Sequence, residues 1–184
     1  METKSRSLFN NALIYGLLTA VVSVVFSIVT YIIDLPYGSP VMYFGFVILL
    51  GGMLYGTIQY RNNFAGGYIS FGNAFLSGFI IVLVAAFISA LYNYVFTSFI
   101  DPAFLEKIVE MTMEKTETDL TSKGLSEEQI EAALAMTRKM MSPSALSIMA
   151  FLSSAVVGAI VSLIAAIFVK KEDTSFDGQF KNVE

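Results

Sequence analysis

Residues 144–169 read SALSIMAFLSSAVVGAIVSLIAAIFV, an apolar run without a single Asp, Glu, Lys or Arg. Three more charge-free stretches occur earlier in the chain, at 7–33, 35–60 and 62–100. A helix crosses the hydrocarbon layer of a bilayer with about 20 apolar residues, so each stretch can hold one transmembrane helix. The longest opens with the turn-forming sequence NNFAGGY at 62–68, which favours one span over two. We therefore expect an all-α integral membrane protein with four transmembrane helices, near 9–33, 41–60, 72–99 and 144–169.

The composition excludes several classes of protein. Of the 184 residues, 55% are hydrophobic and 14% are charged, whereas a soluble domain carries about a quarter charged residues because its surface faces water. This balance excludes a disordered chain, a collagen and a soluble enzyme. The chain also contains no Cys and no His, so it lacks a thiol nucleophile, the commonest general base and the usual zinc ligands.

The interior of the predicted spans offers no group for chemistry. Asp34 and Asp101 are the acids nearest to a span, and both lie at span ends. A proton-coupled transporter needs a charge change within the membrane, and intramembrane hydrolysis needs a nucleophile with a base or a metal. The sequence therefore predicts a protein that is not an enzyme, has no catalytic residue, and binds no metal, cofactor or nucleic acid. A passive pore needs no such group and remains compatible with the sequence.

The distribution of Lys and Arg indicates the orientation in the membrane. Four spans place both termini on the same side as the 61–71 loop, and that side holds Lys4, Arg6, Arg61, Lys170, Lys171 and Lys181. The short 34–40 loop holds no Lys or Arg, and the 101–143 segment is long enough to be translocated regardless of its charge. The first span is about twice as long as the apolar core of a signal peptide, so we expect it to stay uncleaved. These features predict a multi-pass protein of the cytoplasmic membrane with both termini in the cytoplasm.

Small and polar residues within the spans predict where the helices pack, because helices in lipid associate through close contact and polar side chains. The candidates are Gly52 and Gly56 in span two, Asn93 in span three, and Ser154, Gly158 and Ser162 in span four. We expect the small residues to pack inside a single four-helix bundle, with a homodimer seam as the alternative. Asn93 is costly to leave facing lipid, and we expect its amide to bond to a neighbouring helix.

Residues 101–143 have the pattern of two helices joined by a turn. Asp101 and the proline after it form a strong helix start, because Asp caps free amides and Pro is favoured at the first helical position. Gly124 ends that helix, and Ser126 with Gln129 forms a capping box that starts the second. Each helix has an apolar stripe, made of Leu105, Val109, Met113 and Leu120 on the first and of Ile130, Ala133, Leu134, Thr137, Met140 and Met141 on the second. We expect the stripes to pair as an extracytoplasmic helical hairpin; the alternative is that they lie on the membrane surface.

An acidic row runs along the first of these helices. It consists of Glu106, Glu110, Glu114 and Glu117. Like charges four residues apart each cost a few tenths of a kcal/mol. We favour a solvated face, and the alternatives are that a basic protein partner or a divalent cation neutralises the row.

Four ordered motifs link the sequence to a family. They are GGYISFG at 66–72, DPAF at 101–104, GLSEE at 124–128, and VGAIVSLI at 157–164 followed by Lys170 and Lys171. Together they resemble the bacterial four-span membrane proteins catalogued as domain of unknown function 4199, over nearly the whole chain. The resemblance implies a bacterial inner-membrane protein with this layout: one membrane domain over 1–184, the 101–143 hairpin inserted between spans three and four, and a cytoplasmic tail at 170–184. It implies no activity, cofactor or catalytic residue.

The glycines of the 66–72 motif permit positive φ angles and a tight entry into span three. The amides of this stretch are able to hold an anion, but no Lys lies nearby in the sequence and no full phosphate-loop pattern is present, so the signal is weak.

Two functions fit these observations. The first is a non-enzymatic accessory or interaction subunit that sits in the lipid bilayer and presents the acidic hairpin to a protein partner. The alternative is a small transporter or passive pore, built as a homo-oligomer through the small-residue seams of spans two and four.

Overall fold

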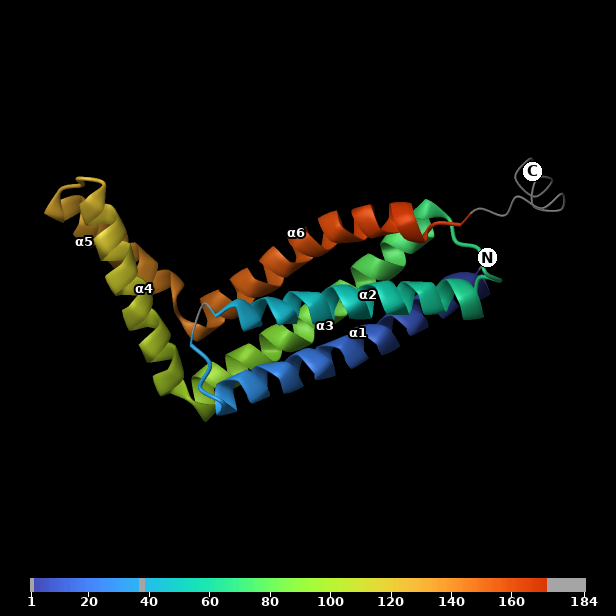
Figure 1. The fold of residues 1–184 in the computed structure, drawn as a ribbon, viewed down its shortest axis with the longest axis horizontal. Coiled ribbons are helices and arrows are strands. Elements are labelled where there is room, and N and C mark those ends of the chain that lie inside the picture. Colours follow the sequence, from blue (N-terminus) through green and yellow to red (C-terminus); the bar gives the residue numbers. More distant parts are fainter. Residues whose placement is uncertain (1, 37–38, 172–184) are drawn as a thin grey trace. The chain divides into compact units, whose positions relative to one another are not determined.

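The computed structural model describes residues 2–36 and 39–171, so most of the predicted 170–184 tail lies outside the described residues. Four long helices carry the apolar sequence (Figure 1): α1 (Glu2–Ile32), α2 (Phe44–Asn63), α3 (Phe71–Val95) and α6 (Pro143–Val169). A short 3₁₀-helix η1 (Pro40–Tyr43) precedes α2, and a π-helical turn η2 (Phe96–Ile100) extends α3. Two shorter helices, α4 (Pro102–Ser122) and α5 (Glu127–Met140), lie between α3 and α6 in the chain.

Four helical stretches are long and apolar enough to cross a membrane. They are Ser7–Ile32, Pro40–Asn63, Phe71–Ile100 and Pro143–Val169, and they overlie the four predicted spans. Between 17% and 39% of each apolar window is buried inside the protein, so most of each helix surface is left to face lipid. The prediction of an all-α integral membrane protein with four transmembrane helices is confirmed.

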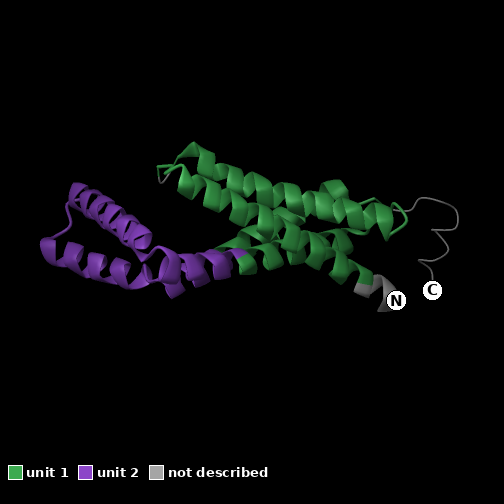
Figure 2. Cartoon of the chain, turned by 90° about the horizontal axis from the view of Figure 1, so that it is seen from below, with its two compact units in different colours: residues 1–88, 153–184 green, residues 89–152 purple. Residues whose placement is uncertain are grey.

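The chain divides into two compact units (Figure 2). Unit 1 comprises residues 1–88 and 153–184, and unit 2 comprises residues 89–152. Helices α3 and α6 therefore contribute one part to each unit. In unit 1, α1 packs against α2 along much of its length.

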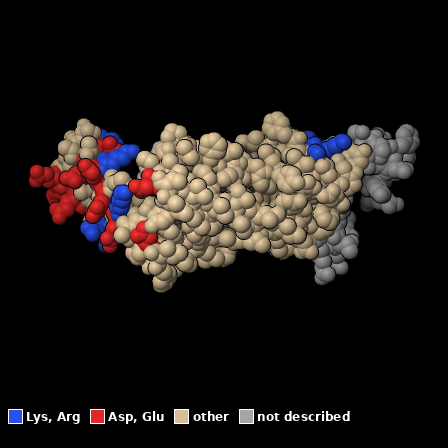
Figure 3. Space-filling model, turned by 60° about the horizontal axis from the view of Figure 1, so that its bottom comes forward, with Lys and Arg blue, Asp and Glu red and all other residues tan. Residues whose placement is uncertain are grey.

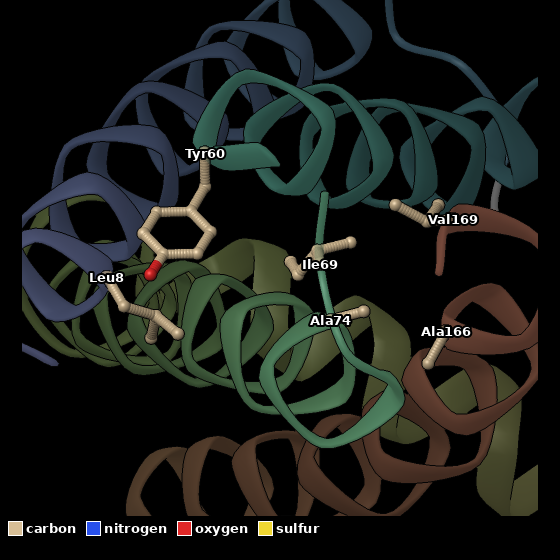
Figure 4. Packing of buried hydrophobic residues seen from close by; sticks show 6 residues of the cluster. All are labelled: Leu8, Tyr60, Ile69, Ala74, Ala166 and Val169. Carbon is tan, nitrogen blue, oxygen red and sulfur yellow. The ribbon is translucent and has the colours of Figure 1, made fainter. Parts of the chain in front are cut away.

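The core of unit 1 has two buried clusters. One contains Ala12, Met53, Ile81 and Val82, contributed by α1, α2 and α3. The other contains Leu8, Tyr60, Ile69, Ala74, Ala166 and Val169 (Figure 4). In Figure 4 the Tyr60 ring reaches from α2 toward Leu8 of α1, and Ile69 lies between Tyr60 and Ala74 of α3. This second cluster joins the N-terminal parts of α1 and α3 to the last turns of α2 and α6.

The connection from α2 to α3 is built on glycines. Gly66 has φ 68° and Gly67 has φ 87°, a region that residues with a Cβ rarely adopt. The chain thereby turns back within a few residues, and Ile69 forms an antiparallel bridge with Lys171. The predicted tight entry into span three is present, and α3 begins at Phe71.

In unit 2 the local signals of the sequence set the helix ends. The Asp101 carboxylate accepts a hydrogen bond from the Phe104 amide (3.1 Å) at the start of α4. Gly124, at φ 73°, follows the end of α4. Ser126 Oγ accepts from the Gln129 amide (3.4 Å) and Gln129 Oε1 accepts from the Ser126 amide (3.2 Å), which is the predicted capping box.

Helices α4 and α5 contact each other within unit 2. The stripe residues Val109, Met113, Ile130 and Leu134 are half-buried, and Leu105 is buried. Met140, at the far end of the second stripe, is 42% exposed.

Candidate functional site

The small residues of α2 face α1 of the same chain. A Cβ atom on Gly52 would collide with the side chain of Thr19. A Cβ on Gly56 would lie 2.6 Å from Tyr15 Cβ and 2.7 Å from Ile81 Cδ1. The neighbouring Gly51 is exposed, and a Cβ there would meet nothing within 4 Å. The surface formed by Gly52 and Gly56 is therefore occupied within unit 1.

The small residues of α6 face α3 and α2. A Cβ on Gly158 would collide with the side chain of Val82. Ser162 is 1% exposed, and its hydroxyl donates to the Met53 sulfur at 3.2 Å. Ser154, one turn before Gly158, is half-buried. This seam too is occupied by helices of the same unit.

Helix α1 supplies a small-residue stripe that the sequence analysis missed. Ala12 and Ala20 are fully buried, and a Cβ on Gly16, midway between them, would lie 2.7 Å from Val84 Cβ and 3.0 Å from the Ile81 carbonyl oxygen. The signal was available, since the three residues recur at i+4 spacing in the same way as the seam of span four.

A second missed residue is Asn11. Its side-chain amide is buried and donates to the Gly56 carbonyl oxygen at 3.0 Å, which links α1 to α2. Asn93, the residue expected to make an interhelical bond, has an exposed side chain, and its carbonyl oxygen accepts a bond from Thr97 Oγ1 in the same helix (2.8 Å). Among the described residues, Asn11 in span one is thus the asparagine whose side chain makes a buried interhelical bond.

The remaining buried hydroxyls in unit 1 bond mainly within their own helices. Thr19 Oγ1 donates to the Tyr15 carbonyl and Thr57 Oγ1 to the Met53 carbonyl. Ser77 is fully buried, and its hydroxyl has no hydrogen-bond partner among the residues that the structure describes.

Basic residues from distant parts of the sequence meet at one end of unit 1. The Arg61 guanidinium donates through Nη1 to the Val169 carbonyl oxygen (3.1 Å) at the end of α6. Just beyond, Ile69 and Lys171 exchange two backbone hydrogen bonds of 2.9 and 3.0 Å. The Lys171 ammonium nitrogen lies 5.5 Å from the centre of the Tyr68 ring. We call Arg61, Tyr68, Lys170 and Lys171 the basic end.

The acidic row lies on α4 in unit 2. Glu106, Glu110, Glu114 and Glu117 are all exposed. Figure 3 shows acidic and basic atoms mixed over α4 and α5, whereas most of the visible surface of unit 1 carries no charge. Across residues 2–36 and 39–171, no three His, Cys, Asp or Glu residues lie close enough to hold a metal ion.

Comparison with known proteins identifies the family and no activity. A model of the family described as "Protein of unknown function (DUF4199)" matches residues 14–171. No curated protein and no solved structure matches the chain. The matched range runs from within α1 through the end of α6 to Lys171, so it includes the glycine turn, the α4–α5 pair and both small-residue seams. The chain belongs to the DUF4199 family of proteins of unknown function.

Proposed function

We propose that this protein is a non-enzymatic accessory subunit of the cytoplasmic membrane that binds a protein partner through the α4–α5 pair. In this proposal both termini are cytoplasmic and α4 and α5 form an extracytoplasmic hairpin. The observation that carries the proposal is the exposed row of four glutamates on a helix whose apolar stripe is half-buried against α5.

The packing of unit 1 supports an interaction role over a pore. The small-residue surfaces that an oligomeric pore would need are already filled by side chains of the same chain, at Thr19 and Tyr15 for α2 and at Val82 for α6. A pore that uses these seams would first have to separate the helices of unit 1. The buried interior of that unit contains no charged side chain among the described residues, and its small residues allow the helices to pack closely.

The charge on α4 supports a basic partner surface. Glu106, Glu110 and Glu114 recur every four residues, and Glu117 continues the row one turn later. Repulsion along such a row lowers the stability of a solvated helix, and a basic partner would relieve it. Complementary charge also raises the rate at which two proteins meet, by steering their approach.

Purification of the full chain from its native membrane in mild detergent tests the proposal. The co-eluting proteins are identified by mass spectrometry and compared for two variants with the same charge change. Glu110→Gln with Glu114→Gln removes half of the row, whereas Glu128→Gln with Glu131→Gln removes two exposed glutamates from α5. We expect a stoichiometric partner that is depleted by the first pair and retained by the second.

Two results would overturn this assignment. Equal recovery of the partner with both double variants would show that the row is not the contact. A homo-oligomer without a partner, which also carries ions or small solutes across reconstituted vesicles, would favour the pore instead.

A further inference from the structure

The basic end gathers cations that the sequence keeps far apart. Arg61 lies in the last turn of α2, and Lys170 and Lys171 follow α6, more than a hundred residues later. Two sets of hydrogen bonds hold them together: that from Arg61 to the Val169 carbonyl, and the backbone pair between Ile69 and Lys171. The Ile69–Lys171 pair uses only the Lys171 backbone, so the Lys171 ammonium group is not needed for these bonds, and the residue is exposed.

Exposed aromatic residues lie within three residues of these cations in the sequence. Phe168, in the last turn of α6, is 80% exposed, and Phe64, directly after α2, is 53% exposed. Tyr68 is also exposed and lies beneath the Lys171 ammonium group. Cations and exposed aromatic residues at the ends of transmembrane helices are typical of the region where a protein meets lipid headgroups.

Acidic side chains are scarce in this unit. Among the side chains of unit 1 that the structure describes, Asp34 is the one carboxylate. Asp34 follows the C-terminal end of α1, whereas the N-terminal part of α1 contributes Leu8 to the same buried cluster as Ile69 and Val169, next to the basic end. Glu172 and Asp173 come next in the sequence and lie outside the described residues.

We infer that the basic end binds the phosphate of an anionic lipid headgroup, while the acyl chains of that lipid lie against the exposed apolar faces of α2 and α6. A soluble phosphate would use the cations but not Phe168, which is the most exposed of the large apolar side chains in the described residues. The inference concerns unit 1 and does not depend on the partner proposed for α4 and α5. It also holds for either orientation of the chain in the membrane.

Lipid preference of the full chain tests the inference. The protein is reconstituted in nanodiscs that contain equal amounts of phosphatidylglycerol and phosphatidylcholine, and the lipids that stay bound after mild extraction are counted by native mass spectrometry. Lys171→Gln removes one charge and leaves the backbone bridge in place. A basic side chain near an anionic surface contributes about a fivefold preference, so we expect a loss of that size. Lys115→Gln, on the exposed surface of α4, is the matched control and should leave the preference unchanged.

Two further variants strengthen the test. Arg61→Lys keeps the charge but loses the planar donor group that reaches Val169. The Ile69–Lys171 backbone pair still holds the two segments together, so we expect this variant to retain the lipid preference. Glu172→Gln with Asp173→Asn should raise the preference, because neutralising adjacent acids strengthens the local positive potential.

Opposite outcomes would overturn the inference. Equal retention of both lipids by the unaltered chain, or the same loss for Lys171→Gln and Lys115→Gln, would show that the basic end selects no headgroup. Inorganic phosphate is the remaining probe: if it raises the thermal stability of lipid-free protein as much as phosphatidylglycerol does, the ligand is a soluble anion and the lipid assignment fails.

Discussion

At the scale of single residues, close contact explains why glycine stands at particular positions. Gly56 lies where the Tyr15 side chain leaves no room for a Cβ, and its carbonyl oxygen accepts the bond from Asn11. Gly51, almost on the opposite face of the same helix, has no such neighbour. Two glycines on one helix thus differ in role, and the difference lies in which face meets α1.

Replacing Gly56 by alanine should therefore destabilise the protein. The added Cβ would lie 2.6 Å from Tyr15 Cβ, an atom close to the backbone that cannot rotate away, and overpacking of this kind costs about 1–3 kcal/mol. Gly51→Ala is the control and should be neutral or slightly stabilising, since alanine favours helix. Thermal unfolding in detergent, followed by circular dichroism, measures both. Equal melting temperatures for the two variants would show that α1 and α2 do not approach this closely.

At the scale of elements, the starts of α4 and α5 were predictable from the sequence, whereas the π-helical turn η2 was not. The caps of α4 and α5 depend on side chains within three residues of the amides they bind, so the sequence alone reveals them. The π turn at the end of span three has no such signal. There the Asp101 amide donates to the Phe96 carbonyl five residues earlier (2.9 Å), which widens the helix just before α4 starts.

The capping box of α5 provides a test at this scale. Ser126→Ala removes the acceptor for the Gln129 amide and should destabilise the start of α5 by about 1 kcal/mol. Hydrogen exchange of the α5 amides in the full chain should then accelerate about fivefold. Ser122→Ala serves as the comparison, because the Ser122 hydroxyl bonds to the Asp119 carbonyl of its own helix and caps nothing. If α5 exchanges equally fast in both variants, the box contributes no stability.

At the scale of the whole molecule, two introduced cysteines distinguish the two possible orientations of the chain in the membrane. The chain has no Cys, so single cysteines can be introduced without removing any native one. Ser122 is the last residue of α4 and Asn62 lies in the last turn of α2, and both residues are exposed, so each can be replaced by a cysteine that reagents can reach. With cytoplasmic termini, a membrane-impermeant maleimide should label Ser122→Cys in intact cells and label Asn62→Cys only after the membrane is opened. The reverse pattern would invert the orientation, and labelling of both in intact cells would contradict four spans.

The spans and the caps follow from the sequence because their causes are local. A charge inside the hydrocarbon layer is costly wherever it occurs, so the charge-free runs are enough to locate four transmembrane helices. The caps at Asp101 and Ser126 likewise need nothing beyond their own turn. Both kinds of feature were predicted correctly.

The helix contacts and the basic end, in contrast, depend on how the spans meet. Lipid is as apolar as the side chains it touches, so a helix that is apolar on every side does not show from its sequence which face packs against a neighbour. That is why the sequence indicated an interhelical bond for Asn93 and none for Asn11, and why it did not by itself show that the Ala12–Gly16–Ala20 stripe of α1 is a contact surface. The 66–72 stretch likewise has no Lys near it in the sequence, and folding brings Lys171 to it through the backbone bonds with Ile69. Shape complementarity between small surfaces selects these neighbours, and it exists only once the helices are in place.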